Sequence, residues 1–326
     1  MIADTHTSFR FLVFGAGAIG TYIGGSLALS GQSVVFIERP QVVDKLIHDG
    51  LHLLLRGKEY HIKSPVIVGS VEDAITSGSF DIAIFAVKSY DTQSTLNELA
   101  PYAVALPPFL CLQNGVENEM KLASVLGDKR VIPGSVLSAI GRRGSGDIVL
   151  EKLRGIAIAR GHPLAPAVAG IFNEAGLNAK LSPNADNMKW SKMLTNLLAN
   201  ASAAILNMPP AEIFIHPGLY HLEVEQIREA IRVMDAQNIK LVDLPGTPVW
   251  ALVNSMTMMP EWFTRPLIGR SLGKGRGGKM PSFHIDLHSG VGRSEVEYLN
   301  GAVVRFGEKY NISTPVNRLL TKILTA

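Results

Sequence analysis

The fold of this chain is decided by residues 11–20, which read FLVFGAGAIG. Four apolar residues predict a buried strand, and a small-residue helical pattern begins within the stretch and continues to residue 30. Residues 15–20 match the pattern GxGxxG, whose glycines make a tight turn, admit a pyrophosphate close to the backbone and let the helix pack on the strand. Because the motif follows a strand and opens a helix, it favours a dinucleotide-binding turn over a βα turn without a ligand.

Short apolar runs alternate with helical patterns through the first 160 residues. Alternation of this kind predicts a doubly wound α/β domain, and the nearly continuous apolar runs are typical of parallel strands covered on both faces. The expected strands are residues 11–14, 34–37, 65–68, 82–87 and 109–112, and the expected helices are residues 18–30, 42–48 and 92–99.

The second half of the chain has a different pattern, in which strand-like runs almost vanish. Apolar residues recur there at spacings of three and four, the periodicity of an amphipathic helix. Pro183 marks a break between elements. We therefore expect a dinucleotide-binding domain at residues 1–182 and an all-helical substrate domain at residues 183–326. The expected helices are residues 187–206, 219–239, 294–310 and 316–324.

Composition argues against several classes of protein. The 326 residues carry 31 Lys+Arg and 28 Asp+Glu, a net charge of +3 without a basic block, so no nucleic-acid partner is expected. No apolar stretch reaches the roughly 18 residues that span a bilayer, and the N-terminus lacks the pattern of a signal peptide, so we expect a cytoplasmic location and no membrane partner. Cys111 lies in an apolar run and is expected to be a buried hydrophobe. His284 and His288 lack a third ligand, and no metal site is expected.

Two charged residues follow the second expected strand and point to different cofactors. Glu38 stands where an acidic residue accepts the ribose hydroxyls of NAD. Arg39 could instead pair with the 2′-phosphate of NADP. The residues alone leave both alternatives open, together with a third in which both are solvated surface charges.

Lys192, Asn196 and Asn200 form a polar stripe at i, i+4 and i+8 of an otherwise apolar expected helix. Buried polar groups are costly unless they have partners, so the stripe needs water, a ligand or hydrogen-bond partners. A ligand site and an interdomain hydrogen-bond ladder explain the stripe equally well when it is considered without other motifs.

Further candidates stand at the ends of expected elements. Asn114 and Lys88 follow expected strands, and the carboxyl edge of a doubly wound sheet is where ligands gather. Ser294 begins a capping-box pattern, which leaves Glu295 available for another role. The glycine-rich basic segment at residues 269–279 is expected to be a surface loop or, in a sharper hypothesis, a lid over an anionic ligand.

Together these residues resemble the ketopantoate reductase (2-dehydropantoate 2-reductase) family. The resemblance spans nearly the whole chain and keeps the family order of the motifs. It implies a Rossmann-type N-terminal domain, a helical C-terminal domain and catalysis in the cleft between them. The pieces that carry it are GAGAIG at 15–20, VKSYD at 87–91, QNG at 113–115, KWSKMLTN at 189–196, Pro281-Ser282 with Asp286, and SEVEYLNG at 294–301.

The resemblance also implies roles for individual residues. Lys192 would be the general acid that protonates the ketone oxygen as hydride arrives, and Glu295 would be a second catalytic residue that orients the substrate hydroxyl. The other substrate-binding residues implied are Asn114, Asn196, Asn200 and Ser282. The cofactor-binding residues implied are Gly15, Ala16, Gly17, Ala18, Ile19, Gly20, Arg39, Lys88, Asn114 and Ala139.

From this resemblance we expect an NADP-dependent oxidoreductase acting on CH–OH, which reduces a 2-oxo acid, first of all 2-dehydropantoate to pantoate on the route to pantothenate and coenzyme A. Glu38 replaces the neutral residue usual in the family and keeps NAD(H) open. The alternatives are an NAD-linked D-2-hydroxyacid dehydrogenase of the same fold, such as a mandelate-type enzyme, and a non-catalytic dinucleotide sensor, which would need no proton donor. The expected partner is a small 2-oxo acid, and a homodimer is the oligomeric state under consideration.

Overall fold

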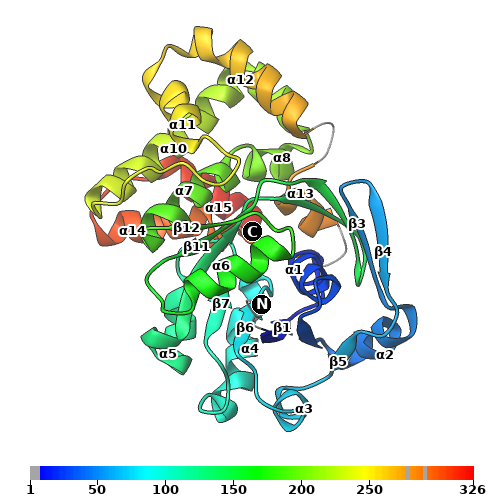
Figure 1. Ribbon diagram of the computed structural model, residues 1–326. Coiled ribbons are helices and arrows are strands. Elements are labelled where there is room, and N and C mark those ends of the chain that lie inside the picture. The colour runs from blue at the N-terminus through cyan, green and yellow to red at the C-terminus, as the bar shows by residue number, and fades with distance from the viewer. Residues whose placement is uncertain (1–7, 277–279, 289–291) are drawn as a thin grey trace, which may run out of the picture. The chain divides into compact units, whose positions relative to one another are not determined.

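The computed structural model describes residues 8–276, 280–288 and 292–326 (Figure 1). The chain divides into two compact units, each described here by itself. Unit 1 comprises Met1–Gln113, Asn118–Ala185 and Pro245–Thr247, and unit 2 comprises Asn114–Glu117, Asp186–Leu244 and Pro248–Ala326. The short segment Asn114–Glu117 therefore belongs to unit 2, although the chain on both sides of it belongs to unit 1.

Unit 1 contains an eight-stranded sheet. Its strands are β1 (Arg10–Phe14), β2 (Ser33–Ile37), β5 (Val66–Val68), β6 (Ile82–Phe85), β7 (Phe109–Cys111), β8 (Val131–Val136), β11 (Ile156–Ala159) and β12 (Ala179–Ser182). Their order is β12-β11-β8-β7-β6-β1-β2-β5, and neighbours run parallel except β8 and β11. The five strands expected from apolar runs are all in this sheet, so the α/β prediction is confirmed.

Helices cover both faces of the sheet. Alternate residues of a strand point to opposite sides, so one strand contributes to an apolar cluster on each face. Phe11 and Val13 of β1 join an apolar cluster with residues of α1, α2 and α6, whereas Leu12 and Phe14 join a cluster with residues of α3, α4 and α5. The helices of unit 1 are α1 (Ala18–Leu29), α2 (Pro40–Asp49), α3 (Val71–Thr76), α4 (Thr92–Leu99), α5 (Asn118–Leu126) and α6 (Ala165–Glu174), with single turns η1 (Ser89–Asp91), η2 (Ala100–Tyr102) and η3 (Asp128–Arg130).

A second, four-stranded sheet in unit 1 was not expected from the sequence. Its strands are β3 (Leu51–Leu55), β4 (Lys58–Ile62), β9 (Ala139–Gly144) and β10 (Asp147–Lys152), in the order β4-β3-β10-β9. Arg56 and Gly57 connect β3 to β4 with φ angles of 52° and 80°, as a two-residue hairpin of type I′ requires. Leu51, Leu53 and Ile148 attach this sheet to the α1 side of the larger one.

Unit 2 is helical, as expected (Figure 1). Its buried residues include Leu194, Val224, Val253 and Val303, which come from helices distributed along the whole unit. The helices are α7 (Ala185–Leu197), α8 (Asn200–Leu206), α9 (Pro210–Ile215), α10 (Pro217–Ala236), α11 (Val249–Met258), α12 (Glu261–Arg276), α13 (Ser282–His288), α14 (Asn300–Lys309) and α15 (Pro315–Thr325), with the single turn η4 (Val296–Tyr298).

Two helices expected to be continuous are interrupted, and those predictions were wrong. The expected helix at 187–206 is divided between α7 and α8, because Ala199 has a left-handed backbone with φ 51°. The expected helix at 294–310 begins only at Asn300, because Leu299 has φ −112° and ψ −82°, outside the helical range.

The expected surface loop at 269–279 is also corrected, since α12 continues through Arg276 and residues 277–279 lie outside the described part of the chain. A glycine inside a helix costs about 1 kcal/mol relative to alanine, which packing can offset. At Gly269 the position of an added Cβ would lie 3.5 Å from the carbonyl oxygen of Phe214 in α9, an ordinary van der Waals contact, so the helix packs against α9 here.

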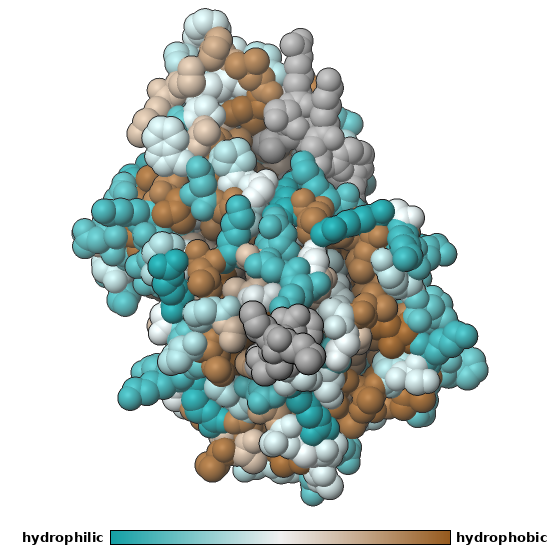
Figure 2. All heavy atoms as spheres, in the orientation of Figure 1, coloured by the Kyte–Doolittle hydropathy of each residue, from teal (hydrophilic) through white to brown (hydrophobic). Residues whose placement is uncertain are grey.

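Cys111 is fully buried in β7, which confirms the prediction that it is a buried hydrophobic residue. Trp250, Met258 and Trp262 on α11 and α12 are 58%, 80% and 74% exposed, and Figure 2 shows hydrophobic residues over the region of these helices. Within the described ranges, every helix is too short or too polar to cross a bilayer.

Candidate active site

Two glycines of the motif at residues 15–20 are required by the backbone conformation and packing of the chain, whether or not a ligand binds. Gly15 follows β1 with φ +90°, a conformation that favours glycine. At Gly20, in the first turn of α1, an added Cβ would lie 1.8 Å from the carbonyl oxygen of Gly15. The first glycine is therefore explained by the turn and the third by the contact between helix and strand.

Gly17 has neither explanation. It precedes α1 with an ordinary φ of −75°, and apart from its chain neighbours no described atom lies within 4 Å of the position of an added Cβ. A side chain here would fill the space in front of the N-terminus of α1, where the backbone N–H groups and the helix dipole favour an anion. The loop therefore fits the pyrophosphate of a dinucleotide.

Glu38 faces this loop from the end of β2. Its Oε2 accepts a hydrogen bond from the N–H of Ala16 at 2.8 Å, and its Oε1 accepts one from the N–H of Arg39 at 2.9 Å. The Glu38 side chain is 14% exposed, whereas the Arg39 side chain is 78% exposed with its Nε 3.6 Å from Glu38 Oε1. The carboxylate thus occupies a defined position beside the loop, and the guanidinium lies at the surface next to it.

Two further residues predicted to bind cofactor lie in unit 1. Lys88 is partly buried and precedes η1, just beyond the carboxyl end of β6. Ala139 is the first residue of β9 in the four-stranded sheet and pairs with Lys152 of β10.

In unit 2, three of the predicted polar residues are joined by hydrogen bonds. The ammonium Nζ of Lys192 donates to Oδ1 of Asn196 at 2.8 Å, and Nδ2 of Asn196 donates to Oδ1 of Asn114 at 3.0 Å. Lys192 and Asn196 come from α7, whereas Asn114 comes from the segment Asn114–Glu117. All three residues of this Lys-Asn-Asn cluster are partly buried.

Asn200 belongs to a different set of contacts. It is 4% exposed, and its Nδ2 donates to the carbonyl oxygen of Asn196 at 3.0 Å and to Oγ of Ser282 at 3.2 Å. Its Oδ1 accepts the N–H of Phe283 at 3.0 Å, at the start of α13. Asn200 therefore holds α13 against α8, and the hydroxyl of Ser282, an exposed residue, contacts the Asn200 amide.

Glu295 is 2% exposed and immediately precedes η4. The hydroxyl of its neighbour Ser294 accepts a hydrogen bond from the N–H of Val296 at 3.4 Å, at the first residue of this single turn, and helix α14 begins only at Asn300. The residues that predicted one capped helix instead build a short turn that buries the Glu295 carboxylate.

One contact that supports the Lys-Asn-Asn cluster was not predicted from the sequence. Arg305 of α14 donates from Nε to Oε1 of Glu117 at 3.1 Å and from a second nitrogen to Oε2, and it also donates to the carbonyl oxygen of Glu297 at 2.9 Å. The Glu117 carboxylate raises the pKa of Arg305 above its usual value. Arg305 thereby fastens the segment that carries Asn114 and the turn that follows Glu295. Residues 188 positions apart offered no local signal for this pairing.

Three buried polar residues of α10 were also missed, namely Glu223, Gln226 and Glu229, which are at most 1% exposed. Their spacing of three residues places them together on the buried side of the helix. That periodicity, interleaved with the apolar positions Val224 and Ile227, was the available signal.

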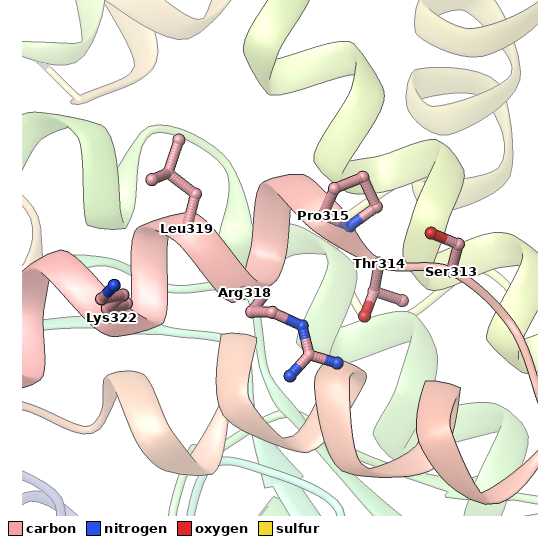
Figure 3. A pocket seen from close by; sticks show the side chains of 6 residues that line it. All are labelled: Ser313, Thr314, Pro315, Arg318, Leu319 and Lys322. Atoms are coloured by element: carbon pink, nitrogen blue, oxygen red, sulfur yellow. The ribbon is translucent and has the colours of Figure 1, made fainter.

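A surface cavity of about 370 Å³ lies along α15 and is separate from these residues (Figure 3). Its lining includes Pro315, Leu319 and the charged residues Arg318 and Lys322, and Arg318 is paired with Glu308 at 2.9 Å. None of the predicted site residues lines it.

Comparison with known proteins identifies the family. Residues 11–162 match the model of "Ketopantoate reductase PanE/ApbA" and residues 184–326 match that of its C-terminal domain. The chain is 26% identical over 322 residues to a 2-dehydropantoate 2-reductase from Pyrococcus horikoshii, covering 97% of each, and 25% identical over 324 residues to one from Lactococcus lactis, covering 97% of this chain and 96% of the relative.

Solved structures show the same fold over the same length. The crystal structure of a PanE/ApbA family ketopantoate reductase from Ralstonia eutropha JMP134 has a TM-score of 0.81 at 29% identity, with 97% of each chain covered. A D-mandelate dehydrogenase in a ternary structure with NADH and anilino(oxo)acetate has a TM-score of 0.78 at 24% identity, again over 97% of each chain, and indicates the fold alone. The matches to both halves of the chain show that this protein belongs to the ketopantoate reductase (PanE/ApbA) family.

Proposed function

We propose that this chain reduces a 2-oxo acid to a 2-hydroxy acid with a reduced nicotinamide dinucleotide, and that 2-dehydropantoate, which would give pantoate, is its substrate. Family membership supports the reaction type. The observation that carries the proposal is the partly buried ammonium of Lys192, held by Asn196 beside the amide of Asn114. A dinucleotide sensor would need the glycine loop but no such proton donor.

Lys192 supplies the proton in this proposal. When bound, the reduced nicotinamide supplies a hydride to the carbonyl carbon, and the oxygen becomes an alkoxide. The Lys192 ammonium donates a proton to that oxygen and so stabilises charge that appears only in the transition state. One of its N–H groups donates to Asn196 Oδ1, a neutral acceptor that orients Nζ.

The remaining predicted residues hold the substrate in this proposal. Asn196 and Asn114 present amides beside the ammonium, and Ser282, held by Asn200 at the start of α13, would bind the substrate through its hydroxyl. Glu295 orients the hydroxyl group of the substrate. Residues 1–182 would act as the cofactor domain and residues 183–326 as the substrate domain.

The geometry around the glycine loop favours NADH over NADPH as the better cofactor. A 2′-hydroxyl can donate to the Glu38 carboxylate, which is already fixed by the N–H of Ala16. A 2′-phosphate would carry its negative charge next to that carboxylate, and the exposed Arg39 would offset the repulsion only in part. The assignment of Arg39 to a 2′-phosphate is therefore the second candidate, and Lys88 and Ala139 would contact either cofactor.

The test is a set of initial rates. Purified protein is assayed with 2-dehydropantoate, phenylglyoxylate, pyruvate and 2-oxoisovalerate, each with NADH and with NADPH. We expect the highest kcat/KM for 2-dehydropantoate. A preference for phenylglyoxylate would instead identify a mandelate-type dehydrogenase, and binding of dinucleotide without turnover of any acid would support the sensor and refute the proposal.

Three finer properties follow from the same proposal and have their own measurements. A role in pantothenate biosynthesis predicts that the gene restores growth without pantoate to a strain lacking this reductase. A cytoplasmic location is checked by cell fractionation, and a homodimer by sedimentation velocity.

A further inference from the structure

The interruption between α7 and α8 lies between two of the polar residues of the site. Asn196 precedes it and Asn200 follows it, and Ala199 between them has φ 51° and ψ 19°. An L-residue enters this left-handed region only against a steric cost, and alanine gains nothing there that would compensate. Contacts from elsewhere in the unit must therefore hold the backbone in this conformation.

Those contacts come from Glu223 of α10, which is 0% exposed. Its Oε2 accepts the N–H of Ala199 at 2.7 Å, and its Oε1 accepts the hydroxyl of Ser202 at 2.5 Å. Gln226, one turn further along α10, donates to the same carboxylate and lies 3.4 Å from the carbonyl oxygen of Leu197. Two residues of α10 thus provide hydrogen-bond partners for the N–H of Ala199 and the carbonyl oxygen of Leu197, at the point where the helix is interrupted.

The interruption changes what the two asparagines do. In a continuous helix the backbone N–H of Asn200 would bond to the carbonyl of Asn196, and the two side chains would lie one above the other. Here the side chain of Asn200 takes that carbonyl and turns to Ser282 and Phe283, while the side chain of Asn196 turns to Lys192. The left-handed backbone at Ala199 therefore lets the side chains of Asn196 and Asn200 point to different partners.

We propose that Glu223 is a positioning residue of the active site, whose carboxylate holds the left-handed backbone at Ala199 and thereby sets Asn196 and Lys192 relative to Asn200 and Ser282. The inference rests on the proposed reductase function. Glu223 contacts the backbone at Ala199 and acts on the site residues through it. Its loss therefore changes the geometry of the proton donor and of the substrate-binding residues together.

The central variant is Glu223→Ala, which leaves the Ala199 N–H without its acceptor. We expect kcat/KM for the 2-oxo acid to fall at least tenfold, while the Kd for NADH, measured by cofactor fluorescence, changes less than twofold because the glycine loop lies in unit 1. Glu223→Gln keeps an oxygen acceptor for the same N–H and should retain most of the activity. If Glu223→Ala does not fold, Glu223→Asp, which withdraws the carboxylate by one methylene, carries the same test.

A second substitution provides a rescue that a general loss of stability would not show. Glycine adopts positive φ without steric cost, so Ala199→Gly restores the preferred conformation by another route. We expect Glu223→Ala/Ala199→Gly to recover at least threefold in kcat/KM over Glu223→Ala. The matched control is Tyr220→Phe, which removes another fully buried hydrogen bond of α10, to Thr264 at 2.8 Å, away from the interruption. It should lower the thermal midpoint and leave kcat/KM within twofold of the wild type.

Hydrogen exchange supplies a readout that does not depend on activity. The peptide spanning residues 196–206 should exchange faster in Glu223→Ala than in the wild type, and more slowly again when Ala199→Gly is added. A wild-type kcat/KM in Glu223→Ala, an equal loss in Tyr220→Phe, or the absence of rescue would each overturn the inference. An inactive wild type would refute the proposed function instead, and in that case the exchange of residues 196–206 alone decides whether Glu223 holds the backbone.

Discussion

Replacement of Gly17 by alanine separates cofactor binding from stability. Gly17 has φ −75°, which alanine adopts readily, and its added Cβ would meet no described atom within 4 Å beyond its chain neighbours. The folded chain therefore loses nothing, while the unfolded chain loses conformational freedom. For substitutions of this kind the free energy of unfolding rises by about 0.4–1 kcal/mol.

The same methyl group lies where a pyrophosphate would approach the N-terminus of α1. Pushing the phosphates away from the backbone lengthens at least one N–H···O bond to a charged group, and such a bond contributes about 1.5–3 kcal/mol. A loss of that size corresponds to an increase of about 10- to 150-fold in Kd for the dinucleotide. Gly17→Ala should therefore bind NADH and NADPH much more weakly although it is slightly more stable than the wild type.

The assay is titration of NADH and NADPH by cofactor fluorescence, with thermal unfolding measured on the same samples. Gly20→Ala is the matched control, because its Cβ would lie 1.8 Å from the carbonyl oxygen of Gly15 and the backbone must move. Forced overpacking of this kind destabilises by about 1–3 kcal/mol, so Gly20→Ala should lose both binding and thermal stability. An unchanged Kd in Gly17→Ala, or a lowered thermal midpoint in that variant, would refute the assignment of this loop.

Four further substitutions test the proton donor, the choice of cofactor and the contact between Arg305 and Glu117. Lys192→Met keeps the apolar stem but removes the proton donor, so kcat should fall about 10²–10⁴-fold with the Kd for NADH unchanged; turnover near that of the wild type would exclude Lys192 as the acid. Glu38→Gln keeps an acceptor for the loop but removes a charge worth about 1.4 kcal/mol against a nearby 2′-phosphate, so the ratio of kcat/KM with NADPH to that with NADH should rise about tenfold; a constant ratio would count against Glu38 as the selector. Arg305→Ala and Glu117→Ala should each lower the free energy of unfolding of unit 2, and their double-mutant cycle should give a coupling of about 1–2 kcal/mol; additive effects in denaturant unfolding would argue against this pair as a clamp.

The strands of the larger sheet could be predicted because burial on both faces leaves an unambiguous pattern. A strand such as β6, with four consecutive fully buried residues, has to be apolar throughout. Asp81 marks its start, whereas the apolar Ala86 and Val87 extended the predicted strand beyond its end. The strands of the smaller sheet carry no comparable run. β4 reads KEYHI and β9 reads AIGRRG, because one of their faces meets solvent, and charged residues at those positions resemble a loop.

Within the candidate site, residue types could be predicted better than contacts. Lys192 and Asn196 are four residues apart, so their spacing predicted that they share one face of a helix, and the structure adds the hydrogen bond between them. Asn114 joins them from a segment 82 residues earlier, and no periodicity in the sequence relates the two. The assignment of Asn114 to the same cluster came from the family resemblance, which carries information about long-range contacts that local pattern does not.

The interruption at Ala199 shows why spacing on a helix can mislead even where the residues are chosen correctly. Leucine and alanine are among the strongest helix formers, so LLAN at residues 197–200 predicts that α7 continues. The opposing preference comes from one carboxylate 24 residues later, whose burial is favourable only if it finds N–H and O–H donors. A continuous helix would offer Glu223 no backbone N–H at position 199, because that group would already be bonded within the helix. The requirement of the buried acid thus outweighs the local propensity, and it converts an i, i+4 pair of asparagines into two residues with separate partners.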